Sequence, residues 1–351
     1  MTPKYLFTIA FLCLLTILPA GLLLNAQTQK NRRKAQDKQP GPANYRISGP
    51  YTHKNLTIFL VHGKDLLPGK NFLTLQEALA QKKVRVYETK EVNELAIRNL
   101  SHQDIYVQAG DIVRGGEQDR MISVDFIVPP RSGRLPIAAF CVESGRWNQR
   151  GGEQAAYFSS SENSVATKEL KLAAKRAMSQ DAVWQKVSAA QEKLSLNVGA
   201  SVQAPISTSS FELSVENSKV KETTASYIGA LDHILRNKSD VIGYAFAING
   251  QVNSADIYAS HALFVKLWPK LLKATAVEAI AESNQKVAAE PVASETIHAF
   301  LADSEQPKSK AKDVTSRVRM VTREDDKNIF FETQDRRAND AWVHRNYIRK
   351  Q

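Results

Sequence analysis

The stretch Val241-Ile-Gly-Tyr-Ala-Phe-Ala-Ile-Asn-Gly-Gln-Val-Asn-Ser-Ala-Asp-Ile-Tyr258 decides the fold class of this 351-residue chain. Two runs of strand character, Val241–Ile248 and Val252–Tyr258, flank the dipeptide Asn249-Gly250. Asn-Gly suits a type I′ turn because both of its residues tolerate positive φ, and this turn matches the twist of paired strands. The stretch therefore predicts a β-hairpin.

Other strand patterns lie mostly before this hairpin, and helix patterns lie both before and after it. Strand-like runs between turn residues occur at Leu56–Val61, Val84–Tyr87, Leu95–Asn99, Asp104–Gln108, Met121–Val128 and Leu135–Phe140. Helical periodicity occurs at Leu73–Ala80, at 170–177, after Ser179, at Lys221–Arg236 and at His261–Ala281. The last strand-like runs are Arg317–Thr322, Ile329–Thr333 and Val343–Ile348. We expect an α+β fold with a β-rich N-terminal half, a helical C-terminal half and final strands that return to the sheet.

A single domain is expected over residues 51–351. Residues 27–50 are polar, contain Pro and Gly and lack apolar periodicity, so they predict a linker before the domain. Within the domain, the polar segment 148–164 and the charged segment 303–314 are expected to be loops.

The N-terminus has the pattern of an export signal. An apolar run at residues 5–24 follows Lys4 and ends before Asn25-Ala26-Gln27, which predicts a signal peptide over 1–26 and an exported protein, periplasmic or secreted. The alternative is a single-pass membrane anchor through residues 5–24, because a run of that length spans a bilayer and basic residues follow it. A membrane contact is expected only through this segment.

Composition restricts the chemistry. The formal net charge of +11 suits an anionic small-molecule ligand, but the basic residues are interleaved with acids and do not support nucleic-acid binding. Removal of Cys13 with the leader leaves Cys141 as the one thiol, which excludes an intrachain disulfide and a Cys-x-x-Cys pair. The seven histidines have no metal-ligand spacing, so no metal is expected and the cofactor is unknown.

Familiar catalytic motifs fail on spacing. The segment His62–Asn71 lies between a strand and a helix as a phosphate-binding loop does, but it has the wrong glycine spacing and lacks a Ser or Thr for magnesium. The segment Cys141-Val-Glu-Ser-Gly-Arg146 spaces a thiol and a guanidinium as a rhodanese loop does. The residues that follow it begin no good helix, so a rhodanese-like thiol enzyme is a lesser alternative.

The pentapeptide Arg-Gly-Gly-Glu-Gln occurs twice, at 114–118 and at 150–154. Only the first copy lies among strand-like runs, and we assign a site to that copy alone. The blocks 110–120 and 141–147 resemble the uncharacterised ARG and rhodanese-phosphatase-superfamily-associated protein domain family. Further matches are Leu73–Leu79, Ala182–Trp184 and 243–260, so the resemblance extends from about residue 55 nearly to the C-terminus.

These two blocks supply the candidate site residues. Ligand contacts are expected from Gly115, Gly116, Gln118, Arg120, Arg146 and Trp147. Paired glycines let backbone N–H groups approach a ligand, an arginine binds a carboxylate or phosphate with two hydrogen bonds, and a tryptophan stacks on a ring. Catalytic roles are assigned to Cys141 and to Glu143 as a base, since strand alternation places them on one face. The structural alternatives are a simple glycine turn, an Arg120–Glu143 ion pair and a tryptophan at the edge of the core.

The resemblance implies a function by association, because the family is named for ADP-ribosylglycohydrolases and rhodanese or phosphatase domains. We expect a domain that binds or processes a phosphorylated, ADP-ribose-like or nucleotide-like small molecule. The alternative is a non-catalytic binding or scaffold domain of the cell envelope. Whether the protein is an enzyme stays open at this point.

Overall fold

The computed structural model describes residues 44–284 and 291–350. The predicted signal peptide and most of the predicted linker therefore lie outside the described residues. Among the described residues, no helix has the length and apolar character needed to cross a membrane.

The predicted hairpin is confirmed and lies in the middle of the largest sheet. It consists of β12 (Val241–Ile248) and β13 (Gln251–Tyr258), and every residue of β12 is buried. Asn249 and Gly250 have φ of 51° and 76°, the positive values that a type I′ turn requires.

Eight antiparallel strands form this sheet in the order β1-β2-β12-β13-β17-β16-β15-β14. The remaining strands are β1 (Arg46–His53), β2 (Leu56–His62), β14 (Ser309–Asp313), β15 (Val318–Glu324), β16 (Asn328–Asp335) and β17 (Ala341–Arg349). The expected return of the final strands is confirmed, because β17 pairs with β13 on one side and with β16 on the other.

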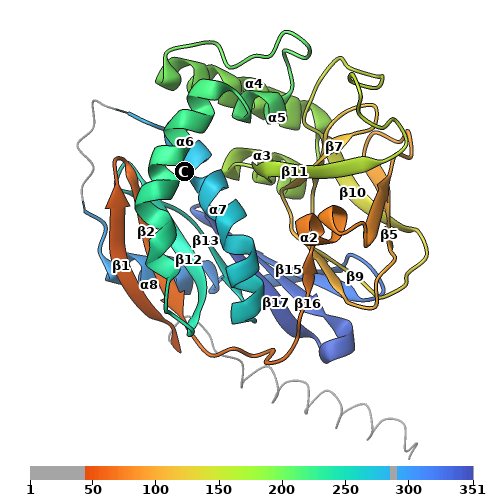
Figure 1. Ribbon diagram of the computed structural model, residues 1–351. Coiled ribbons are helices and arrows are strands. Elements are labelled where there is room, and N and C mark those ends of the chain that lie inside the picture. Colours follow the sequence, from red (N-terminus) through yellow and green to blue (C-terminus); the bar gives the residue numbers. More distant parts are fainter. Residues whose placement is uncertain (1–43, 285–290, 351) are drawn as a thin grey trace, which may run out of the picture. The chain divides into compact units, whose positions relative to one another are not determined.

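Helices cover both faces of the sheet (Figure 1). On one face, apolar side chains of β2 and β12 share a core with α4 (Gln180–Val198), α6 (Ser218–Leu231) and α7 (His261–Ala281). On the other face, α8 (Ser294–Ser304) contributes Ile297, Phe300 and Leu301 to a second core. Short helical segments complete this part of the chain: α3 (Lys168–Leu172), η2 (Ala173–Ala177), α5 (Phe211–Val215), η3 (Asp232–Leu235) and η4 (Arg336–Ala338).

A second sheet has six strands in the order β11-β7-β8-β10-β5-β4. Its members are β4 (Val84–Tyr87), β5 (Glu94–Asn99), β7 (Asp111–Gly115), β8 (Arg120–Ile122), β10 (Leu135–Cys141) and β11 (Phe158–Val165). The first and last strands of this order meet through one bridge between Tyr87 and Tyr157, and Glu88 N donates to Ala156 O at 3.2 Å. The sheet therefore closes nearly into a barrel around its own apolar core.

A small sheet, β3-β6-β9, lies beside this barrel together with the helix α2 (Leu75–Ala80). Its strands are β3 (Leu73–Thr74), β6 (Ile105–Val107) and β9 (Phe126–Val128). Buried ion pairs connect this region to the eight-stranded sheet. Arg317 binds Asp335 at 2.7 Å and Asp104 at 2.5 Å, and His344 lies between Asp125 and Asp256 at 2.7 and 3.0 Å.

Several predicted boundaries were wrong. β1 begins at Arg46, inside the segment predicted as linker, and β14 lies inside the segment 303–314 predicted as a loop. β11 begins inside the predicted polar loop 148–164 and ends one residue beyond it. The predicted strand Met121–Val128 is two strands, β8 and β9, which belong to different sheets.

Candidate functional site

The two copies of the pentapeptide meet at one end of the six-stranded barrel. Strand β11 follows the second copy and pairs with β7, which contains the start of the first, so that Phe158 faces Gly115. Gly116 N donates to Gln154 O at 3.0 Å, and Arg114 forms an ion pair with Glu153. Strand pairing thus brings the two copies into contact.

The glycines of the first copy are required by the backbone. Gly115 and Gly116 have φ of 123° and 57°, a region that residues with a side chain rarely adopt. A Cβ atom on Gly116 would also collide with the ring of Phe158 and the carboxylate of Glu88. Gly115 and Gly116 form a tight turn between β7 and β8. This turn is the structural role that the sequence offered as the alternative to a ligand contact.

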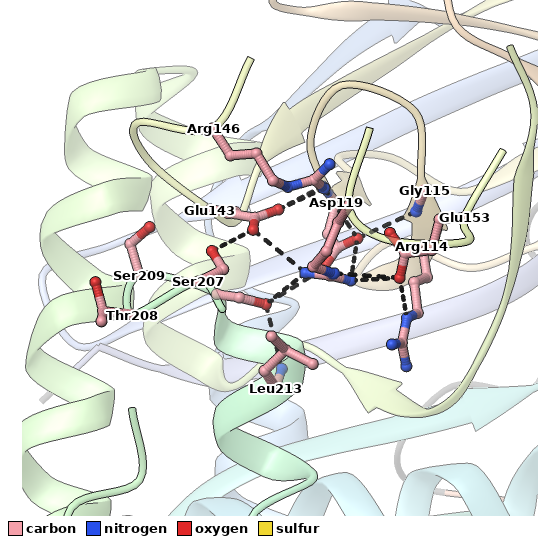
Figure 2. A network of polar contacts seen from close by, with 12 residues as sticks. Arg114, Gly115, Asp119, Glu143, Arg146, Glu153, Ser207, Thr208, Ser209 and Leu213 are labelled. Atoms are coloured by element: carbon pink, nitrogen blue, oxygen red, sulfur yellow. Dashed lines mark hydrogen bonds and ion pairs between the residues drawn. The ribbon is translucent and has the colours of Figure 1, made fainter. Parts of the chain in front are cut away.

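Next to this turn lies a buried layer of charged side chains, which we call the inner network: Asp119, Glu143, Arg146 and Arg150. Arg146 binds Glu143 at 2.7 Å, and Arg150 binds Asp119 at 3.0 Å and Glu143 at 3.2 Å. Figure 2 shows Asp119 and Glu143 among these contacts. The side chains of both acids have no exposed surface.

Hydrogen bonds satisfy the two acids further. Gly115 N donates to Asp119 Oδ1 at 3.1 Å, and Ser210 Oγ donates to Asp119 Oδ2 at 3.3 Å. The Glu143 carboxylate accepts from the hydroxyl of Ser207 and from Asp119 N. These serines lie just before α5 and at its N-cap, so the inner network holds a helical segment against the barrel.

The pKa values of the two acids in the inner network are shifted in opposite directions. Burial raises the pKa of Asp119 to about 6, against the lowering effect of Arg150, and the neighbouring Glu143 charge adds to the rise. The pKa of Glu143 is lowered because, although burial opposes ionisation, hydrogen bonds from Arg146 and Ser207 favour the carboxylate. Asp119 is therefore the acid in this layer that titrates near pH 6.

Above the inner network lies a cavity of about 770 Å³, which we call the ligand cavity. Arg114, Glu153 and Glu216 line it together with Tyr157 and Ser159–Ser161. Arg114 binds Glu153 at 2.5 Å and Glu216 at 2.9 Å, and its side chain is 29% exposed. Arg150 lines this cavity and also a second cavity of about 530 Å³, as do Gly151 and Ile206, so the two cavities are neighbours.

The chain matches a known protein family. The family model of the ARG and Rhodanese-Phosphatase-superfamily-associated Protein domain covers residues 44–348. This chain belongs to that family. Comparison with curated proteins and with solved structures gives no significant match.

The site residues that were predicted from the resemblance to this family lie at different places in the structure. In this ARG and rhodanese-phosphatase-associated domain, Arg120 is buried, donates to Val92 O at 2.5 Å and binds Glu88 at 3.3 Å. Cys141 lies opposite Arg120 in the β8–β10 pair, with its Sγ atom 3.9 Å from Val92 O. Glu143 is in the inner network instead.

The expected shared pocket of Cys141 and Glu143 is not formed, because β10 ends at Cys141 and strand alternation does not continue to Glu143. Neither side chain lines the ligand cavity. Burial raises the pKa of the Cys141 thiol to about 11, against the effect of Arg120, so this thiol is protonated at neutral pH. Their catalytic roles stay predictions that this geometry does not favour.

The other predicted residues have separate places in the domain. Gln118 is fully buried, and its amide atoms have no hydrogen-bond partner among the residues that the structure describes. Arg146 belongs to the inner network, and Trp147 is 51% exposed on the surface outside the ligand cavity. Over residues 44–284 and 291–350, no group of His, Cys, Asp or Glu side chains is arranged to hold a metal ion.

Sequence reasoning missed most of the residues that form this site. Arg150 and Glu153 come from the second pentapeptide, which lies in the segment predicted as a loop and was given no site. The signal that marks them is the pentapeptide itself, because the first copy supplies Arg114 and the second supplies its partner Glu153. The repeat is not a duplicated element, but both copies contribute to one site.

Proposed function

We propose that this domain binds a small molecule with several hydroxyl groups in the ligand cavity, and that it acts by binding rather than by catalysis. The volume of about 770 Å³ is within the range of pockets for small ligands. The carboxylates of Glu153 and Glu216 accept hydrogen bonds from hydroxyl groups, Arg114 donates them, and the ring of Tyr157 offers a stacking surface.

The observation that carries this proposal is an unsatisfied acceptor in the cavity wall. Glu153 lines the ligand cavity, and its Oε1 atom binds Arg114 and Arg150. Its Oε2 atom is buried and has no hydrogen-bond partner among the described residues, which is unfavourable for a carboxylate oxygen. A turn of the Glu153 carboxylate toward the cavity would let this atom accept from a ligand hydroxyl and satisfy it.

Binding is favoured over catalysis because the acids with shifted pKa values do not reach the cavity. Asp119, whose pKa is raised to about 6, and Glu143 have no exposed surface and lie beneath Arg150. A general base has to come within hydrogen-bond reach of the substrate, directly or through one water molecule. The inner network supports the cavity floor instead.

The family description supports the choice of probe. It names ARG and rhodanese-phosphatase proteins as associates of this domain, which suggests ribosyl and phosphoryl groups in the ligand. ADP-ribose carries several hydroxyl groups and two phosphates, so it is the ligand that we would test first.

The test is calorimetric titration of the purified full chain with ADP-ribose. Wild-type protein is expected to bind saturably, and Glu216→Gln and Arg114→Ala are expected to weaken binding at least tenfold. Arg319→Ala is the matched control, because Arg319 is 28% exposed and is also paired with two carboxylates, those of Asp313 and Asp340.

Circular dichroism and thermal unfolding verify that each variant is folded. Absence of saturable binding to the wild type would contradict the proposal. Equal weakening by the Arg319→Ala control would contradict it as well, since the effect would then come from net charge rather than from the cavity.

A further inference from the structure

Three arginines lie side by side on the outer face of the six-stranded barrel. Arg85 of β4 is directly opposite Arg98 of β5 in the antiparallel register. Leu135 of β10 is opposite Ile97, which places Arg134 next to Arg98 on the third strand. All three side chains are exposed. We call this set the arginine row.

The arginine row lacks counter-charges. None of the three side chains has an ion pair or hydrogen bond with another residue in the described part of the chain, whereas the side chains of Arg114 and Arg150 are paired with carboxylates. Like charges directly opposite in a strand pair destabilise a sheet. The nearest acid on β5 is Glu94, four residues from Arg98 and about 13 Å away along the strand.

Two tyrosine rings hold part of the row in place. The guanidinium of Arg134 lies 4.1 Å from the ring centroid of Tyr87, and that of Arg85 lies 5.5 Å from the ring centroid of Tyr157. The two rings contact each other edge to face at 5.4 Å. Stacking on a ring uses the face of a guanidinium and leaves its N–H edge for an anion.

A cavity begins at the row. It has a volume of about 590 Å³, and Lys82, Arg85 and Tyr157 are among its lining residues. No Asp or Glu of the described chain lines it, in contrast to the ligand cavity. The two cavities share the wall Tyr157–Ser160, where the barrel closes.

We propose that the arginine row binds two adjacent phosphate groups of a small-molecule ligand. Neighbouring strands are about 4.8 Å apart, so three cations across three strands extend over about 10 Å, a span suited to a diphosphate. Arginine N–H edges bind phosphate oxygens with two parallel hydrogen bonds. One element of this proposal rests on the proposed function: a single ligand places its hydroxylated part in the ligand cavity and its diphosphate at the arginine row.

The test uses inorganic pyrophosphate, which has the anion without the hydroxyl groups, titrated into the full chain at constant ionic strength. Wild-type protein is expected to bind it saturably, and Arg98→Glu is expected to weaken this binding at least tenfold. The same variant is expected to melt, without ligand, at the same or a higher temperature than the wild type, because a Glu opposite Arg85 replaces repulsion with attraction.

Two controls distinguish binding at the arginine row from a general effect of net charge and from binding in the ligand cavity. Lys310→Glu makes the same change of net charge on the exposed edge strand β14 and should leave pyrophosphate binding unchanged. Arg114→Ala in the ligand cavity should also leave it unchanged. Absence of saturable pyrophosphate binding, or equal losses in Arg98→Glu and Lys310→Glu, would overturn the proposal.

A loss of pyrophosphate binding in Arg114→Ala would place the anion in the ligand cavity and would overturn the proposal too. Failure of the proposed function has a different signature, since Glu216→Gln would then leave ADP-ribose binding intact. The two results are therefore distinguishable within one set of variants.

Discussion

Replacing Asp119 with Asn is expected to change how stability depends on pH. Asp119 is a buried acid whose pKa is raised from 3.8 to about 6 in the folded protein, chiefly by burial. The folded state binds this proton more tightly than the unfolded state does. Its contribution to stability is therefore fully present below pH 3.8 and is lost as the pH rises through 6.

The size of this loss follows from the shift. A change of about two pKa units corresponds to about 3 kcal/mol at pH 8, which is an upper bound for a site that relaxes. Asn does not titrate, so the variant does not have this loss. The stability of Asp119→Asn relative to the wild type should therefore rise by about 2.5 kcal/mol between pH 4 and pH 8, whatever constant cost comes from the lost Arg150 contact.

Urea unfolding of both proteins at several pH values from 4 to 8 measures this difference. Asp104→Asn is the matched control, because Asp104 is also buried, but hydrogen bonds from Arg317 and Lys70 outweigh burial and lower its pKa. Above pH 5, Asp104 is ionised in the folded and unfolded states, so its variant should show a constant difference from the wild type. A difference for Asp119→Asn that is also constant across this range would refute the reasoning.

Two further predictions concern the turn and the thiol. Gly116→Ala should destabilise the protein by at least about 2 kcal/mol in urea unfolding, because of its positive φ and the collision with Phe158, whereas Gly152→Ala at the same position of the second pentapeptide should be nearly neutral. An equal loss of stability in Gly116→Ala and Gly152→Ala would show that a side chain at position 116 does not strain the first turn. In a Cys13→Ser background, native Cys141 should react with a thiol reagent at pH 8 at least 100-fold more slowly than in urea, since burial raises its pKa to about 11. Rapid labelling of the native protein would restore the rhodanese-like alternative.

The sequence predicted those parts of the fold that have a strong local signal. The turn at Asn249-Gly250 and the long helix His261–Ala281 were located from local patterns, and the final strands from their apolar runs. Strand β11 was missed because it opens with Phe158 and three serines and has no apolar alternation. It becomes a strand through pairing with β7, which is information from a distant segment.

The site was harder to predict because it depends on that same distant pairing. The first pentapeptide was recognised, but the partners of its Arg114 are Glu153 of the second copy and Glu216, directly after α5. The basic residues showed the same limit. Arg85, Arg98 and Arg134 are dispersed in the sequence and become neighbours only through strand register.

The position of β17 between β13 and β16 has a consequence for synthesis in the cell. The hairpin that forms the centre of the large sheet leaves the ribosome long before β17 does, so the open side of β13 stays unpaired until the chain has been made through Arg349. An unpaired strand edge is a site for association with other chains. Premature termination before β17 would make this exposure permanent, and the product would be expected to aggregate or to be degraded.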